Sequence, residues 1–459
     1  MTRVIELNDV ALRLADADAV LASSPGYAVV DAKRLVVGTA AERQARLDPR
    51  HTTNQFWHRL SMDPVPHPHP SARSLADLAH AHLLELWAAA DVAGEDDADV
   101  IFTLPGTLER EQIALLLGIA RECPFTPVGL VDAAVAATTF AGARSAVVAH
   151  VDALLHEAVV TIVEAEDGQW QRRRVQEIPA LGIAPLREAW INVIADAFVR
   201  ETRFDPLHDA RTEQTLFDGL DDWLASLSAA PEIEIELQSA AQVHRVALTR
   251  ERVVEKILPR LAPLLDAVAG ALPDDGEVLL SPRFGRLPGM VEALTDRLGR
   301  APRTIAEDAA LGGALANEDE IRHDGEALRF VTRLPRVELP PGTDSATAAA
   351  PVTAPGAPSR ADAPTPIATA AVTDAPAVTH VLLGHRAWPL AGERMELGGE
   401  NGLDPVRFPL HLGTLERRVD GWHLRPATGG PELPAMAPGE ARVLGPAHTI
   451  VTLIRVERD

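Results

Sequence analysis

Residues 145–163 read SAVVAHVDALLHEAVVTIV, two apolar runs separated by a short polar hinge. The runs cover 145–149 and 158–163, a pattern typical of a buried strand followed by its hairpin partner. Polar side chains in and beside the hinge include His150, Asp152 and Glu157. We expect the segments on both sides to be organised around this hairpin.

Composition limits the classes of protein to consider. A chain of 459 residues with 46% hydrophobic content predicts two to three domains with a proper core. The net charge of −23 argues against nucleic acid as a partner, because an acidic surface repels phosphates. A single cysteine, Cys123, excludes an internal disulfide and a cysteine-based zinc site. Without a signal-peptide core or a run of ~20 apolar residues, we expect a cytoplasmic protein that is not bound to a membrane.

The segments before the hairpin alternate between strands and helices. Short strands are predicted within 4–37, a helix over 73–91, a buried strand over 99–105 and a helix over 108–122. Four prolines alternate with His67 and His69 over 64–70, which favours a solvated loop over a metal site because a third ligand is missing nearby.

The segments after the hairpin continue this alternation. Helices are predicted over 186–202 and 212–228, followed by a half-exposed strand over 232–237. Thr249 is expected to cap a long helix that ends near 272. A strand over 277–280 then leads into a turn with Ser281 and Gly285, and a closing helix follows near 307–314.

In this collinear order the chain resembles the actin-like ATPase superfamily, most closely its DnaK-type heat-shock chaperone branch. The resemblance covers about residues 1–335 and is strongest over the strand, proline, helix order of 99–137. It implies a two-lobed, actin-like (ribonuclease-H-like) α/β domain over 1–338.

The resemblance also implies a degenerate nucleotide cleft. Glu6, Asn8 and Asp9 fall on the first phosphate loop, and His150 and Asp152 replace an Asp and a Gly of the second. Positioned charge supplies most of the rate in phosphoryl transfer, so these losses imply a pseudo-ATPase with no catalytic residues and no cofactor. The other cleft positions are His58 (the catalytic lysine), Asp132 (a metal-holding glutamate), Glu157 beside the second loop, Asp222 and Trp223 (the adenosine clamp), and Ser281 and Gly285 (the adenosine turn).

Several alternatives stay open beside the pseudo-ATPase. A working ATPase or chaperone could hold ATP and magnesium by unfamiliar residues, and a filament-forming actin relative is a third possibility. His150, Asp152 and His156 could bind a metal, although side chains filling the former phosphate space are favoured. The run 172–174 of three arginines could form an anion patch, although a solvated strand end is favoured in so acidic a chain.

The chain beyond residue 338 changes character twice. Residues 339–378 are rich in Ala, Pro, Thr and Ser, which predicts a disordered linker. Residues 379–459 contain many short strands with Gly and Pro punctuation, which predicts a small all-β sandwich, and they resemble a forkhead-associated domain. Gly399, His411 and Gly429 fall on its phosphopeptide loops, where the usual donors are mostly missing. We therefore expect a scaffold or adaptor that binds other proteins through both domains, with its oligomeric state left open.

Overall fold

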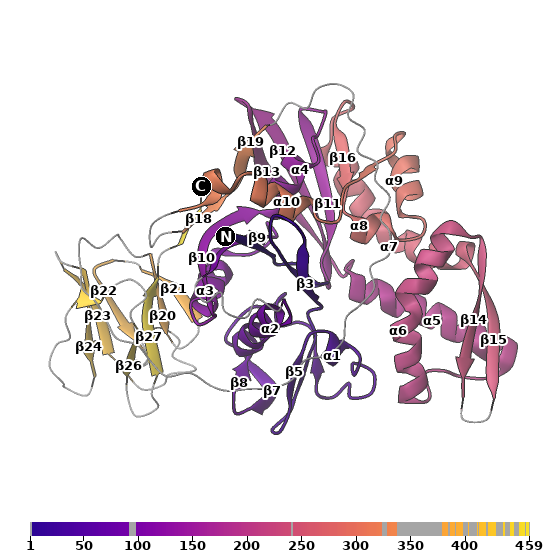
Figure 1. Cartoon of the computed structure of the whole chain (residues 1–459), viewed down its shortest axis with the longest axis horizontal. Helices are drawn as coiled ribbons and strands as arrows, with labels where there is room; N and C mark the ends of the chain where they lie inside the picture. Colours follow the sequence, from indigo (N-terminus) through magenta and orange to yellow (C-terminus); the bar gives the residue numbers. More distant parts are fainter. Residues whose placement is uncertain are drawn as a thin grey trace.

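A computed structural model shows a mixed α/β architecture with several sheets flanked by helices (Figure 1). The structure describes residues 2–90, 98–239, 242–323 and 328–336. Further along the chain it describes 379–383, 386–390, 392–397, 403, 411, 413–418, 421–427, 435–436, 441–444, 449–454 and 456–458. The predicted linker over 339–378 lies outside the described residues.

The first large sheet has seven strands in the order β28-β18-β10-β9-β1-β2-β3. Strands β1, β2 and β3 form an antiparallel meander, and β9, β10 and β18 add to β1 in parallel. Its strands are β1 (Arg3–Glu6), β2 (Leu12–Ala15), β3 (Val20–Ser24), β9 (Ala98–Leu104), β10 (Phe125–Asp132), β18 (Leu328–Val331) and β28 (Val456–Arg458).

The second large sheet has six strands in the order β17-β16-β11-β12-β13-β19. Strands β11, β12 and β13 form an antiparallel meander, and β16 and β17 add to β11 in parallel. The first five strands of each half therefore follow one scheme, a meander extended by two parallel strands. Its strands are β11 (Val147–Ala153), β12 (Glu157–Glu166), β13 (Gln169–Pro179), β16 (Glu277–Leu280), β17 (Arg303–Thr304) and β19 (Arg333–Pro335).

Two helices, α4 (Ala133–Phe140) and α10 (Ala309–Ala316), join the two sheets into one core. They pack against each other, and their apolar side chains share a cluster with Val4 and Ile101 of the first sheet and Val148 and Val163 of the second. The approach is close, since a Cβ on Gly313 would lie 2.0 Å from the Ala136 carbonyl oxygen. A larger residue at this glycine would force the helices, and with them the sheets, apart.

The remaining elements cover these sheets or extend from them. Helices α2 (Leu75–Ala89) and α3 (Arg110–Ala120) pack on the first sheet, within a separate cluster of buried apolar side chains. The small elements are α1 (Thr39–Glu42), β4 (Ala28–Val30), β5 (Leu35–Val37), β6 (Thr52–Thr53), β7 (Pro64–His69), β8 (Ala72–Ser74), α8 (Pro282–Gly285), α9 (Met290–Leu298) and α11 (Glu318–Ile321). An outer lobe contains α5 (Ile183–Thr202), α6 (Ala210–Ala229), β14 (Glu232–Gln238), β15 (Val243–Thr249) and α7 (Arg250–Ala271).

Most local predictions agree with these bounds. The Thr249 hydroxyl accepts a hydrogen bond from the Arg252 N–H at the start of α7, which confirms the predicted cap. The helices predicted over 108–122, 186–202 and 212–228 correspond to α3, α5 and α6. The proline-rich segment that we expected to be a loop is wrong in detail, because Pro64–His69 forms strand β7, paired only with β8. A two-stranded ribbon tolerates prolines, since few of its N–H groups take part in a ladder.

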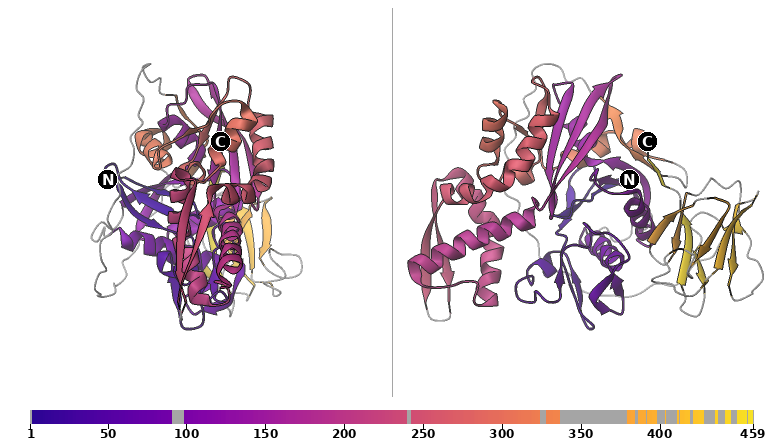
Figure 2. Two further views of the ribbon diagram at one scale, coloured as in Figure 1. Left: turned by 90° about the vertical axis from the view of Figure 1, so that its right-hand side faces the viewer. Right: turned by 180° about the vertical axis from the view of Figure 1, so that it is seen from behind.

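The C-terminal region holds two four-stranded antiparallel sheets, β21-β20-β27-β26 and β22-β23-β24-β25. Side chains of both sheets, among them Val381, Leu415, Trp422 and Leu453, share one buried cluster. These sheets and the outer lobe lie at opposite ends of the molecule (Figures 1 and 2). The strands are β20 (His380–Leu383), β21 (Arg386–Pro389), β22 (Arg394–Leu397), β23 (Gly413–Arg418), β24 (Gly421–Pro426), β25 (Ala435–Met436), β26 (Ala441–Leu444) and β27 (Thr449–Ile454).

Strand β28 belongs to the first large sheet, although the sequence places it in the C-terminal region. It pairs in parallel with β18, with Leu328 opposite Val456 and Phe330 opposite Arg458. The predicted domain over 379–459 therefore contributes one strand to the sheet of the domain predicted over 1–338.

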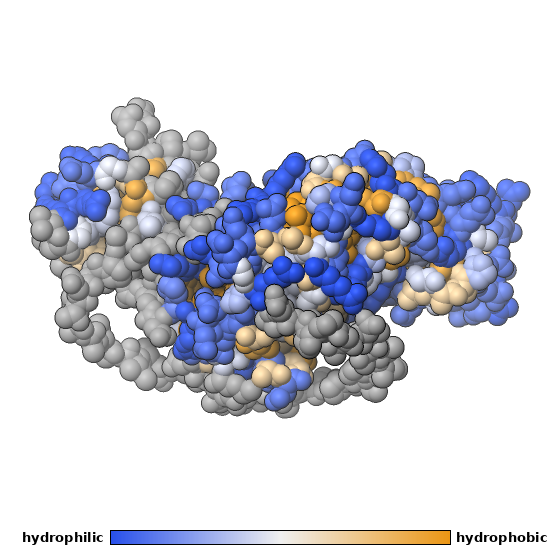
Figure 3. Space-filling model, turned by 90° about the horizontal axis from the view of Figure 1, so that it is seen from above, coloured by the Kyte–Doolittle hydropathy of each residue, from blue (hydrophilic) through white to orange (hydrophobic). Residues whose placement is uncertain are grey.

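The described surface is mostly hydrophilic on the face seen in Figure 3, with apolar side chains gathered in several separate patches. Among the described residues, every helix is too short or too polar to span a lipid bilayer.

Candidate functional site

The two predicted phosphate loops lie against each other between the two large sheets. Strands β1 and β11 are interior strands of their sheets, and the loop after β1 meets the end of β11. Asn8 donates from Nδ2 to Asp152 Oδ2 at 3.2 Å and to the Ala153 carbonyl at 3.1 Å. Asp9 Oδ1 accepts a hydrogen bond from the Leu155 N–H at 2.7 Å. These bonds hold the loops in direct contact.

A network of four charged side chains, which we call the buried ion network, lies beside these loops. It consists of Glu6, Arg13, Asp152 and Arg283. Arg283, from α8, donates to Glu6 Oε1 at 2.9 Å and lies 3.4 Å from both carboxylate oxygens of Asp152. Arg13 donates from Nε to Glu6 Oε2 at 2.8 Å. Only 4% of the Glu6 side chain and 15% of the Arg283 side chain are exposed.

The ionisation of this network follows from its pairing. Desolvation by burial disfavours the charged guanidinium of Arg283, yet the carboxylates of Glu6 and Asp152 outweigh it and raise the pKa of Arg283. Burial likewise disfavours the charged form of Asp152, but Arg283 helps to lower its pKa below the ordinary value. Arg283 and Asp152 are therefore both charged at neutral pH. The network is a matched set of two arginines and two carboxylates.

Very little space remains between the loops. A cavity of about 20 Å³ is lined by Glu6, Asn8, His150 and Asp152 together with apolar neighbours. This volume accommodates about one water molecule. Burial lowers the pKa of His150, so its imidazole is neutral at pH 7 and fills space without adding charge. His156, the third residue of the possible metal set, turns elsewhere, since its Nε2 bonds the Asn54 carbonyl at 2.9 Å.

Asp132 has a structural role at the start of α4. Its Oδ1 accepts hydrogen bonds from the N–H groups of Ala134 and Val135, so it caps the helix. Its Oδ2 accepts from Arg172 at 2.8 Å. The other two arginines of that run also have partners, because Arg173 pairs with Glu164 at 3.1 Å and Arg174 donates to a glutamine. Both oxygens of Asp132 are thus engaged by protein groups.

His58 and Glu157 lie in a second, larger cavity of about 270 Å³ on the other side of Asp9. His58 Nδ1 is 4.0 Å from Glu157 Oε2, and its ring lies beside that of His156, with centroids 5.3 Å apart. Burial, helped by the neighbouring Glu177 and Asp9, raises the pKa of Glu157 to about 7. Burial raises the pKa of Asp9 to about 6.

The predicted adenosine positions do not gather around either cavity. Asp222 is exposed on α6, and Trp223 is half-buried on the same helix, packed against the core of the second half. Ser281 is buried just before α8, and Gly285 ends that helix. A Cβ on Gly285 would lie 2.7 Å from Thr304, so this glycine serves close packing.

Sequence reasoning missed the two arginines of the buried ion network. Arg13 is only 6% exposed and lies in strand β2 among buried apolar residues. A charged residue inside an apolar strand is a signal, because such a residue is rarely buried without a partner. Arg283 directly follows the Ser281–Pro282 pair and carried no comparable signal.

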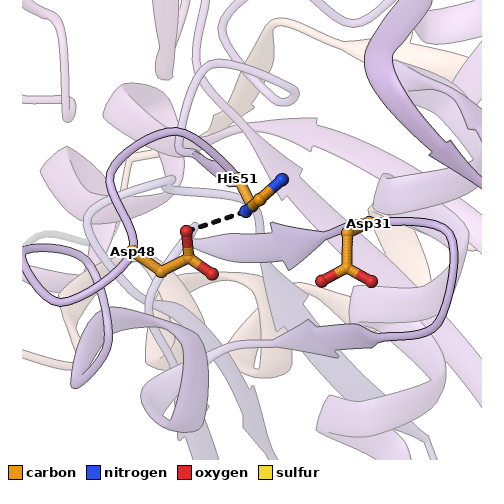
Figure 4. A group of neighbouring side chains, drawn as sticks. All are labelled: Asp31, Asp48 and His51. Atoms are coloured by element: carbon orange, nitrogen blue, oxygen red, sulfur yellow. Dashed lines mark hydrogen bonds and ion pairs between the residues drawn. The ribbon is translucent and has the colours of Figure 1, made fainter.

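One cluster of the described residues has the composition of a metal site. Single ligand atoms of Asp31, Asp48 and His51 lie within 4.8 Å of one another (Figure 4). Arg34, however, donates to Asp31 Oδ2 at 2.9 Å and also to Asp48, while His51 Nδ1 bonds Asp48 at 2.8 Å. The guanidinium already supplies the positive charge that these carboxylates need, so the cluster is an ion-pair group.

The predicted phosphopeptide positions are described only in part. Gly399 and Gly429 lie outside the described residues. His411 is exposed, and its Nε2 lies 3.2 Å from Glu396 Oε2. Its nearest charged partner is thus a carboxylate.

Comparison with known proteins gives no relative from which to infer a function. No protein-family model matches the sequence, and no curated protein matches it.

Proposed function

We propose that this chain is a catalytically inactive, DnaK-type pseudo-ATPase that works as a scaffold or adaptor between proteins. The observation that carries the proposal is the buried ion network, which occupies the place where the resemblance puts the nucleotide phosphates. The loops around it are hydrogen-bonded to each other, and the cavity between them holds about one water molecule.

Charge complementarity supports the same proposal. A magnesium-bound triphosphate needs cationic or N–H donors that are free to receive it. Arg283 is the one cation that borders the former phosphate space in the described chain, and Glu6 and Asp152 occupy its donors. Displacing these carboxylates would leave buried charges without partners, at a cost of about 3–5 kcal/mol. A nucleotide would have to overcome this cost before gaining any contact.

The repeated strand scheme supports an actin-like, two-lobed fold for residues 1–338. Each half starts with an antiparallel meander and continues with two parallel strands, and helices α4 and α10 pack between the halves. Two such halves around a central cleft would form the scaffold that the resemblance implies.

The nucleotide part of the proposal can be tested by thermal unfolding. We expect no rise in melting temperature when millimolar ATP and magnesium are added to the full chain. A ligand present at a hundred times its dissociation constant would stabilise the protein by about 2.7 kcal/mol, which is readily detected. A clear, saturable rise in melting temperature would instead favour an ATPase that holds nucleotide by unfamiliar residues.

For the C-terminal sheets we propose phosphate-independent protein binding on a forkhead-associated-like sandwich. A phosphate group needs charge-assisted donors, each worth roughly 1.5–3 kcal/mol, to offset its desolvation. The remaining candidate, His411, lies beside the carboxylate of Glu396, which would repel a phosphate.

This part is tested with a phosphothreonine peptide library and its unphosphorylated counterpart. Because β28 joins these sheets to the rest of the molecule, the titration uses the full chain. We expect no preference for the phosphorylated peptides. A strong preference that His411→Ala abolishes would show that the phosphopeptide site survives.

A further inference from the structure

The second cavity, which we call the acidic cavity, combines acidic and apolar walls. Four carboxylates line it, and Leu7, Leu108, Leu154 and Trp57 form apolar parts of its wall. The four carboxylates belong to Asp9, Glu109, Glu157 and Glu177.

The charge of this cavity is unbalanced. None of its lining residues within the described chain is a lysine or an arginine. Its one imidazole, His58, has a pKa lowered by burial and by the neighbouring His156, so it is mostly neutral at pH 7. Buried carboxylates are normally paired with a cation or with several donors. The acidic cavity therefore differs from the Asp31 cluster, where Arg34 supplies the counter-charge.

Asp9 points to a missing partner. Its side chain lines the cavity, and the residue is only 5% exposed. Its Oδ1 accepts the Leu155 N–H, but its Oδ2 has no hydrogen-bond partner in the described part of the chain. An unsatisfied buried carboxylate oxygen is costly, and such groups in native proteins call for an explanation by a ligand or by function.

The size and walls of the cavity limit the ligand. At about 270 Å³ it lies just below the usual range of drug-sized pockets, so it fits a small group or the end of one side chain. Its carboxylates do not present three ligand atoms within 4.8 Å of one another, as a preformed metal site would. The leucines and Trp57 suit an aliphatic stem, and the indole face suits a cation.

We propose that the acidic cavity binds one alkylammonium or alkylguanidinium group, with the cation at Asp9 and Glu157 and the aliphatic stem against Leu108 and Trp57. Such a group is supplied either by a basic side chain of a partner protein or by a small free amine. The inference does not depend on the loss of nucleotide binding, because it concerns a different cavity and a ligand of opposite charge.

Isothermal titration of the full chain at pH 8, where both buried carboxyls are largely ionised, tests the proposal. The probes are agmatine and an acetylated, amidated Ala-Ala-Arg-Ala-Ala peptide, and a peptide with citrulline in place of arginine is the neutral control. We expect saturable binding of at least one cationic probe and none of the citrulline peptide. Peptide binding would identify a partner side chain as the source, and binding of agmatine alone would identify a small amine.

Matched variants assign the binding to the cavity. Loss of one charge-assisted hydrogen bond weakens binding by about 10- to 100-fold, which is the effect expected for Glu157→Gln. Glu177→Gln, at an exposed position on the rim, is a second variant that leaves the core intact. Glu166→Gln removes the same charge from the same strand as Glu157 but outside the cavity, and should change affinity less than about 2-fold. Failure of both cationic probes to bind, or equal affinities for Glu157→Gln and the wild type, would overturn the proposal.

Discussion

Replacing Arg283 with leucine is expected to lower the free energy of unfolding by about 3–5 kcal/mol. The arginine pairs with Glu6 at 2.9 Å and with Asp152 at 3.4 Å, and both carboxylates are largely buried. Without the guanidinium, two negative charges remain in a poorly solvated site with only Arg13 to balance them. Urea unfolding of the full chain at pH 7 measures the loss.

Arg297→Leu is the matched control for this change. Arg297 pairs with Asp266 at 3.1 Å, but both side chains are about half exposed or more, so its loss should cost less than about 1 kcal/mol. In the Arg283→Leu background, Asp152→Asn should recover part of the lost stability because it removes one unpaired charge. Equal losses for Arg283→Leu and Arg297→Leu would show that the buried ion network does not hold the loops together.

Replacing Asp9 with asparagine is expected to stabilise the protein at pH 8 by up to about 3 kcal/mol. Burial raises the pKa of Asp9 from its ordinary value of 3.8 to about 6, so ionising this carboxyl costs free energy in the folded state. Asparagine keeps an oxygen that can accept the Leu155 N–H and carries no charge.

The pH dependence gives this prediction its sign. Between about pH 4 and pH 6 the folded protein keeps a proton on Asp9 that the unfolded chain has lost, so wild-type stability falls as the pH rises through this range. The advantage of Asp9→Asn should therefore be near zero at pH 4 and fully developed at pH 8. Asp222→Asn, at an exposed position, should stay within about 0.5 kcal/mol at both values. A variant that is less stable than the wild type at pH 8 would contradict the prediction.

The two predictions have opposite signs because the two carboxylates have different neighbours. Asp152 has a guanidinium beside it, and its charge contributes to the fold. Asp9 faces the acidic cavity with one oxygen unpartnered, and its charge weakens the fold. Stability that is sacrificed at one position is often linked to binding at that position. Asp9→Asn should accordingly stabilise the free protein while weakening the binding of a cationic probe.

The sequence was sufficient where structure depends on neighbours along the chain. Thr249 caps α7 because its hydroxyl reaches an N–H three residues later, and residues 145–163 form β11 and β12 because their apolar runs are separated by one short hinge. The resemblance also correctly grouped Asn8, Asp9 and Asp152, which hydrogen bonds place at adjoining loops.

Long-range partners could not be predicted in this way. Arg283 balances Glu6, 277 residues earlier, and no local pattern specifies such a pair. The resemblance assigned Asp132 to a metal, whereas its capping bonds and its contact with Arg172 depend on how β10 and β13 approach each other. Pairing between β18 and β28 likewise joins segments with no periodic relation in the sequence.

The pairing of β28 with β18 also has a consequence for synthesis. Strand β18 ends at Val331, and the residues that pair with it, 456–458, leave the ribosome only after all the strands from β20 to β27. Until then the first sheet has an open edge at β18, ready to pair with another chain. Closing so long a loop is slow, since its entropy is lost before the contacts form. The nascent chain therefore carries an exposed strand edge throughout the translation of its C-terminal region, when it depends most on protection from aggregation.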